Sequence, residues 1–309
     1  MNAFVFANTQ DPKQQINGMN ASFLPLAGRP LLIYVLMALD RVTQIEKVIV
    51  IGATKEIMRA IESVIFEIPF QKRIVVAEEK ETFLESVFFA ETESRKKGGV
   101  PDGLNMASEP ALFLPGNIPF LTTAEVSRFI AACDMTKADC YLSMIPDKAT
   151  SFFRAEQTQT DLGDREKQGL SLGRLILAKC DAIGNSDAIK QIEHHYKKRQ
   201  TDQAPPPLQL ETFLKNIGVS PTKKHTETST VFSEIEEKMS TLLKTRFKFT
   251  PCATAGNALC AEDEPSYQFL LDHFEDWRKH IMTLKTEEGD KICSISGTAC
   301  EPHDNGHEH

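Results

Sequence analysis

The feature that most constrains the fold is an alternation, over about the first 150 residues, of short apolar runs and segments with helical periodicity. The apolar runs predict buried strands at Ala3–Ala7, Lys47–Ile51, Arg73–Ala77, Ala111–Leu114 and Asp139–Ile145. The segments between them predict helices at Leu31–Leu39, from Thr54 to about Phe66, at Phe83–Phe88 and from Thr122 or Thr123 to Cys133. Because such alternation gives βαβ units, we predict an α/β fold with three layers (α/β/α) around a mainly parallel, twisted, Rossmann-like sheet.

The alternation weakens after Ile145. Two further strands are expected, at Arg174–Lys179 and Arg246–Phe249, with helices at about 188–199, 208–217, 231–244 and 265–284. We expect one domain over residues 1–285, with a polar flap at about 147–170 and an inserted helical segment at about 185–245. Residues 286–309 are polar, which predicts a disordered tail.

Charge and composition narrow the classes of partner. The formal net charge is −8, which disfavours a broad surface for nucleic acid or for an anionic membrane. No segment approaches the roughly 20 apolar residues of a membrane span, and the first residues, MNAFVFANTQ, do not have the pattern of a signal peptide. Seven scattered cysteines are typical of reduced thiols. These features predict a cytoplasmic protein.

Ligands of a parallel α/β sheet bind beyond the carboxyl ends of its strands, so the loops there carry the candidate site. The segment Phe23–Leu36, FLPLAGRPLLIYVL, places a tight turn at Gly28 and a helix start at Pro30, with Arg29 between them. After the fourth strand, LPGNIPFLT keeps turn residues at Gly116 and Pro119 and a helix cap at Thr122. Further on, ALCAEDEPSYQFL resembles an acidic helix start, which suits the helix dipole.

Taken in order, these segments resemble the MobA-like nucleotidyltransferases, a family with an NTP transferase domain of the GT-A-like fold. The family patterns are K-x-L-L-x-L-x-G-R-P-L-L-x-x-V-L, x-x-G-D-x-P-x-L-T and D-V-D-T-P-E-D, and the resemblance covers residues 1–150 well and 170–285 loosely. It implies that a nucleoside triphosphate and a small-molecule acceptor bind, with Mg²⁺, and that nucleotidyl transfer releases pyrophosphate. The nucleotide-binding positions that it implies are Asn8, Thr9, Lys13, Gly28, Arg29, Ser86, Gly116, Asn117 and Pro119.

Several of these positions depart from the family pattern. Asn8 and Thr9 replace loop glycines, and Ala21 replaces a basic residue for which Lys13 could substitute as a charge. Asn117 stands where the family has a metal-binding Asp, and an amide oxygen is a weaker Mg²⁺ ligand than a carboxylate. Of the later pair of Asp residues, the first corresponds to Ala261 and the second to Asp263, so Asn117 and Asp263 are the implied metal ligands.

Two function hypotheses stay open at this point: an active nucleotidyltransferase, or a catalytically degenerate relative that binds a nucleotide, a metabolite or a protein. A glycosyltransferase of the related nucleotide-sugar fold ranks last, because its Asp-x-Asp position reads Asn117-Ile118-Pro119 here. Neither the base, the acceptor nor the oligomeric state is set by the sequence.

Outside the resemblance, the tail could hold Zn²⁺, because thiolates and imidazoles suit this ion. The candidate ligands are Cys293, Cys300, His303 and His307. A disordered His-rich tail, or adventitious metal binding, is the alternative interpretation.

Overall fold

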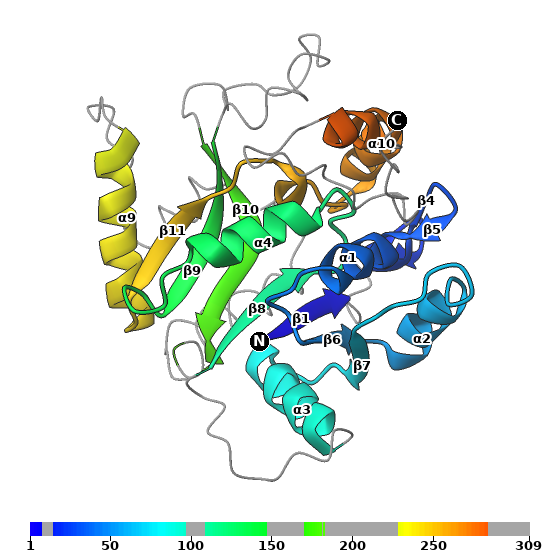
Figure 1. Ribbon diagram of the computed structural model, residues 1–309, viewed down its shortest axis with the longest axis horizontal. Coiled ribbons are helices and arrows are strands. Elements are labelled where there is room, and N and C mark those ends of the chain that lie inside the picture. Colours follow the sequence, from blue (N-terminus) through cyan, green and yellow to red (C-terminus); the bar gives the residue numbers. More distant parts are fainter. Residues whose placement is uncertain (8–14, 97–108, 147–169, 181, 183–227, 284–309) are drawn as a thin grey trace, which may run out of the picture.

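The computed structural model describes residues 1–7, 15–96, 109–146, 170–180, 182 and 228–283 (Figure 1). Its centre is a seven-stranded sheet with the strand order β11-β9-β10-β8-β1-β6-β7. The strands are β1 (Asn2–Ala7), β6 (Lys47–Gly52), β7 (Arg73–Glu78), β8 (Pro110–Pro115), β9 (Cys140–Pro146), β10 (Leu170–Lys179) and β11 (Phe247–Pro251). In this sheet β10 runs antiparallel to both neighbours, and the other six strands are parallel to one another. The expectation of a mainly parallel sheet is confirmed.

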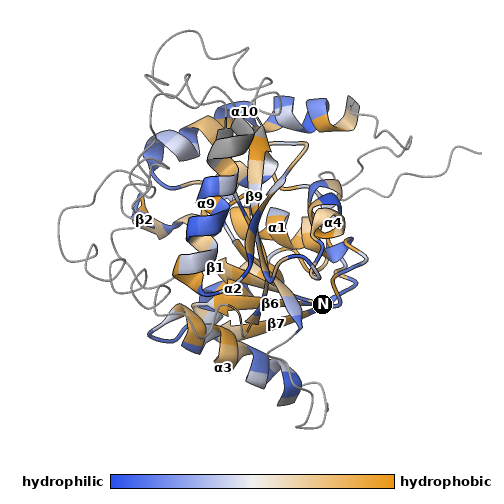
Figure 2. Ribbon diagram, turned by 90° about the vertical axis from the view of Figure 1, so that its left-hand side faces the viewer, coloured by the Kyte–Doolittle hydropathy of each residue, from blue (hydrophilic) through white to orange (hydrophobic). Residues whose placement is uncertain are grey.

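Helices cover both faces of the sheet and give the three layers. One face packs against α1 (Leu31–Asp40), α2 (Thr54–Glu62), α4 (Thr123–Ala132) and α10 (Glu264–Thr283). The other face packs against α3 (Phe83–Lys96) and α9 (Thr228–Leu243). Because side chains alternate along a strand, Ala3 and Val5 of β1 enter the first core and Phe4 enters the second. Figure 2 shows hydrophobic strands in the middle of the molecule, with hydrophilic residues on α9 and α10.

Several boundaries differ from those predicted. The helix α2 ends at Glu62, short of the predicted Phe66, and Phe66 is 99% exposed. The predicted start of this helix at Thr54 is confirmed, with Ala53 at the N-cap position. Between the first predicted strand and the first predicted helix lies a hairpin that was not predicted, formed by β2 (Gln15–Ile16) and β3 (Met19–Asn20). Its two turn residues have positive φ, as two-residue hairpins require.

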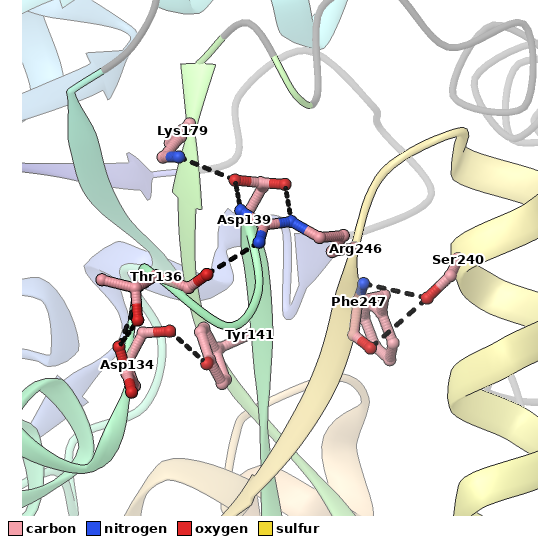
Figure 3. Close-up of polar contacts among 8 residues, drawn as sticks. All are labelled: Asp134, Thr136, Asp139, Tyr141, Lys179, Ser240, Arg246 and Phe247. Carbon is pink, nitrogen blue, oxygen red and sulfur yellow. Dashed lines mark hydrogen bonds and ion pairs between the residues drawn. The ribbon is translucent and has the colours of Figure 1, made fainter.

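Asp139 ties three strands together at the amino end of β9 (Figure 3). Its Oδ1 accepts hydrogen bonds of 2.7 Å from Lys179 Nζ and from a terminal nitrogen of Arg246, and its Oδ2 accepts one of 2.8 Å from Arg246 Nε. The Arg246 hydrogen bonds, and the charge of Lys179, hold the pKa of Asp139 well below its usual range. This cluster lies at the end of the sheet opposite to the carboxyl ends of the parallel strands.

Several sequence predictions lie outside the described residues. They are the polar flap at 147–170 for all but its last residue, the helices at 188–199 and 208–217, the tail, and the candidate zinc ligands Cys293, Cys300, His303 and His307. The described cysteines are free thiols, as expected for a reduced protein. Among the described helices, none has the length and apolar character needed to cross a bilayer.

Candidate functional site

The candidate site lies where β1 and β8 end side by side. These strands are parallel neighbours, with Phe6 opposite Pro115. The chain adds β6 and β7 on one side of β1 and then crosses to the other side to form β8. The gap between β1 and β8 is therefore the topological switch point of the sheet, the place where α/β folds of this kind bind ligands.

The turn after β8 packs closely against the end of β1. The backbone N–H of Gly116 donates to the carbonyl of Phe6 at 2.8 Å. A Cβ on Gly116 would lie 3.1 Å from both Leu32 Cδ1 and Ser22 Oγ, so a glycine permits this close approach. Asn20 completes the junction, because its Nδ2 donates to the carbonyl of Ala7 at 3.3 Å and its Oδ1 accepts from the N–H of Ser22.

Asn117 fastens this turn to the segment that precedes α10. Its side-chain Nδ2 donates to the carbonyl of Ala261 at 2.7 Å, and the N–H of Ala261 donates back to the carbonyl of Asn117 at 3.2 Å. We call this pair the Asn117–Ala261 clamp. The structure therefore brings together the two positions at which the family resemblance places carboxylates, but an amide and a buried methyl group occupy them.

Asp263, the second implied metal ligand, caps α10. Its Oδ1 accepts from the N–H of Ser266 at 2.9 Å, and Ser266 Oγ accepts from the N–H groups of Glu262 and Asp263. This is the acidic helix start that the sequence also suggested. Within the part of the chain that the structure describes, no group of three or more His, Cys, Asp or Glu residues is arranged to hold a metal ion.

Arg29 and Gly28 lie in a second small hairpin, formed by β4 (Pro25–Leu26) and β5 (Arg29–Pro30). Gly28 has φ +81°, which confirms the predicted tight turn. The helix α1 begins after Pro30, with Arg29 still in β5, and the guanidinium of Arg29 pairs with Glu67 at 3.2 Å. Arg29 therefore lies just before α1, as the sequence predicts, and its role in nucleotide binding stays a prediction.

Ser86 and Pro119 are both buried. Ser86, one of the implied nucleotide-binding positions, is 2% exposed. Its Oγ accepts from the N–H of Lys80 and donates to the carbonyl of Thr82, each at 2.8 Å, which fixes the loop between β7 and α3. Pro119 lies in the turn after β8, between the fully buried Ile118 and Phe120. The remaining predicted residues Asn8, Thr9 and Lys13 lie outside the described residues.

A buried polar network behind this turn was missed by sequence reasoning. Asn257, in the 3-10 helix η6 (Gly256–Ala258), accepts at Oδ1 from Ser143 Oγ and from the N–H of Arg174, each at 2.9 Å. Its Nδ2 donates to Glu125 Oε1 at 2.8 Å. The only sequence signal was the spacing of Thr122 and Glu125, which matches a capping box; Thr122 Oγ1 indeed accepts from the N–H of Glu125.

Comparisons with known proteins support the fold. No protein-family model matches the sequence, and no curated protein matches it significantly. A hypothetical transferase from Thermus thermophilus aligns with a TM-score of 0.55 and 14% identity, over 86% of this chain and 98% of its own. Two others, each at 14% identity, are 4-diphosphocytidyl-2C-methyl-D-erythritol synthase from Anaerococcus prevotii (TM-score 0.46; 89% of this chain, 95% of its own) and the bifunctional IspDF from Campylobacter jejuni (TM-score 0.43; 86% and 53%). The chain thus shares the α/β fold of the Thermus transferase, and the predicted fold class is confirmed.

Proposed function

We propose that this chain is a MobA-like nucleotidyltransferase-type protein that binds a nucleoside triphosphate between the carboxyl ends of β1 and β8. The observation that carries this proposal is the switch point, with Gly116 pressed against the end of β1. Ligand sites of open α/β sheets form at such a crevice. A small-molecule acceptor would bind beside the nucleotide, toward β10. The ordered resemblance of the segments around Gly28 and Gly116 to the family patterns gives the same ligand class.

The residues at the implied metal position do not fit Mg²⁺. This ion prefers carboxylate and water oxygens in octahedral geometry. Asn117, whose Nδ2 is held by the Ala261 carbonyl, has only an uncharged oxygen to offer, Ala261 has no side-chain oxygen, and the Asp263 carboxylate caps a helix. The Asn117–Ala261 clamp therefore favours the second function hypothesis: the nucleotide binds without a metal, and metal-assisted nucleotidyl transfer is lost.

Calorimetric titration with ATP, GTP, CTP and UTP tests this proposal. We expect at least one nucleotide to bind, with the same affinity in MgCl2 as in EDTA. If no nucleotide binds under either condition, the proposed ligand class is wrong. If binding requires Mg²⁺ and pyrophosphate is released, the clamp does not replace the metal and the chain is an active transferase.

Replacing Asn117 with aspartate is expected to convert the clamp into a metal-sensitive site. The substitution removes the donor to the Ala261 carbonyl and puts a carboxylate against it, which should cost about 1–3 kcal/mol of stability in EDTA. Mg²⁺ should restore part of this loss, because the ion relieves the contact between the two oxygens. Thermal unfolding with and without MgCl2 measures both effects, with the exposed Gln71→Glu as a control for non-specific binding. An Asn117→Asp chain that melts at the same temperature with and without MgCl2 would argue against a metal position at the clamp.

A further inference from the structure

We propose that Arg174 supplies the positive charge that neutralises the phosphates of the bound nucleotide, in place of a metal ion, and that Glu262 holds this guanidinium while the site is empty. The inference rests on the proposed function and specifies the chemistry of the same site.

Arg174 lies beside the switch point. The strand β10 runs antiparallel to β8, with Ile176 opposite Phe113, so residue 174 lies toward the carboxyl end of β8. The pairing of β10 with β9 shifts register between Leu172 and Ile176, which marks a bulge that includes Arg174. Bulges commonly redirect a side chain next to a functional site.

The bulge is anchored firmly from behind. A Cβ on Gly173 would collide with Asn257 Oδ1 and Ser143 Oγ, so only glycine fits there. The N–H of Arg174 donates to Asn257 Oδ1 at 2.9 Å, and the N–H of Leu175 donates to Ser143 Oγ at 3.0 Å. The backbone of Arg174 is therefore fixed, while its side chain extends toward the Asn117–Ala261 clamp.

The guanidinium reaches the clamp through Glu262. A terminal nitrogen of Arg174 donates to Glu262 Oε1, and Glu262 directly follows the clamped Ala261. The Nε of Arg174 is buried without a hydrogen-bond partner, so one donor of the planar fork is unused. Both side chains remain about one third exposed, at 35% and 37%. The Arg174 guanidinium, with one N–H donor unpaired, therefore lies beside the Asn117–Ala261 clamp, where the family resemblance places the metal-binding carboxylates.

The Arg174 guanidinium can exchange the Glu262 carboxylate for a phosphate group. Guanidinium binds phosphate oxygens in a two-pronged geometry that a carboxylate can also occupy. A partly exposed ion pair contributes little to stability, so a phosphate can displace Glu262 at small cost. In the empty site, Glu262 would compete with the ligand and repel its negative charge.

Two substitutions with opposite expected effects test this inference. Arg174→Gln should weaken binding of the nucleotide found by titration, and of inorganic tripolyphosphate, by about tenfold or more in EDTA, because a charge-assisted hydrogen bond is lost. Glu262→Gln should strengthen binding several-fold, because it releases the guanidinium and removes a repelling charge. Arg174→Lys should give an intermediate affinity, since lysine keeps the charge but not the fork.

A matched control is Arg246→Gln, which breaks another Arg–carboxylate pair at the opposite edge of the sheet (Figure 3). It should leave the affinity unchanged. If Arg174 and Glu262 only tie the structure together, both variants will shift the affinity in the same direction or not at all. That result, with nucleotide binding intact in the unsubstituted chain, would overturn this inference and leave the proposed function standing. Failure of the unsubstituted chain to bind any nucleotide would overturn both.

Discussion

Replacing Glu125 with glutamine is expected to raise the free energy of unfolding by about 3 kcal/mol above pH 7 and to change it little near pH 4.5. Glu125 is buried, and its Oε2 has no hydrogen-bond partner. Burial raises the pKa of this carboxyl from 4.5 to about 7, against hydrogen bonds from Asn257 that lower it. Glutamine keeps the size and an acceptor oxygen for Asn257, and it avoids burying a charge.

The direction of the pH dependence follows from the raised pKa. Between pH 4.5 and about 7 the folded chain holds a proton on Glu125 that the unfolded chain has released. The stabilisation from this group is therefore complete below pH 4.5 and is lost as the pH rises through about 7. Each pH unit in this interval lowers the free energy of unfolding by about 1.4 kcal/mol.

Urea unfolding at several pH values between 4.5 and 8 measures this effect, as the difference between the Glu125→Gln chain and the unsubstituted one. Groups such as His280, whose pKa is lowered by burial, titrate in both chains and cancel. The exposed Glu237→Gln serves as a control for the loss of a surface carboxyl. If the difference in free energy of unfolding between the Glu125→Gln chain and the unsubstituted chain does not vary with pH, the folded chain stabilises the buried carboxylate, and the prediction is wrong.

Most of the sheet could be predicted from the sequence, because strands that are buried on both faces have a recognisable local pattern. A parallel strand covered on both faces becomes a continuous apolar run, as at Val48–Ile51. The cap at Thr122 is also local, since its hydroxyl accepts from an N–H only three residues away. The antiparallel direction of β10 could not be predicted in this way, because an apolar run is compatible with both parallel and antiparallel pairing. The Asn17-Gly18 dipeptide is a hairpin signal, but strands of two residues flank it and leave no periodicity.

The candidate site depends on contacts that are distant in the sequence. The Asn117 side chain reaches a carbonyl 144 residues later, and Asn257 reaches Glu125 across 132 residues. Sequence reasoning identified Asn117 as a lost charge, but the partner of its amide is a backbone group, which no side-chain pattern specifies. The Arg174–Glu262 pair could likewise not be predicted, because only the fold brings the β10 bulge next to the segment before α10.

Replacing Trp277 with alanine is expected to cost about 3–5 kcal/mol of stability, the largest effect anticipated for a single substitution in this chain. Trp277 of α10 is 1% exposed, and its ring stacks on that of Phe120 with centroids 5.6 Å apart. Its Nε1 donates to the Phe120 carbonyl at 3.1 Å. Alanine would leave a large cavity and remove the donor to a buried carbonyl.

The substitution should also affect the candidate site, because Phe120 belongs to the turn that carries Asn117. We expect Trp277→Ala to weaken nucleotide binding even at urea concentrations below its unfolding midpoint, where the chain is folded. Trp277→Phe should lose less stability, since it keeps most of the apolar volume. Urea unfolding and the nucleotide titration measure the two effects. Phe66→Ala, which removes a fully exposed ring, controls for the loss of an aromatic side chain and should change neither. A Trp277→Ala chain as stable as Phe66→Ala would show that α10 does not hold the turn after β8 in place.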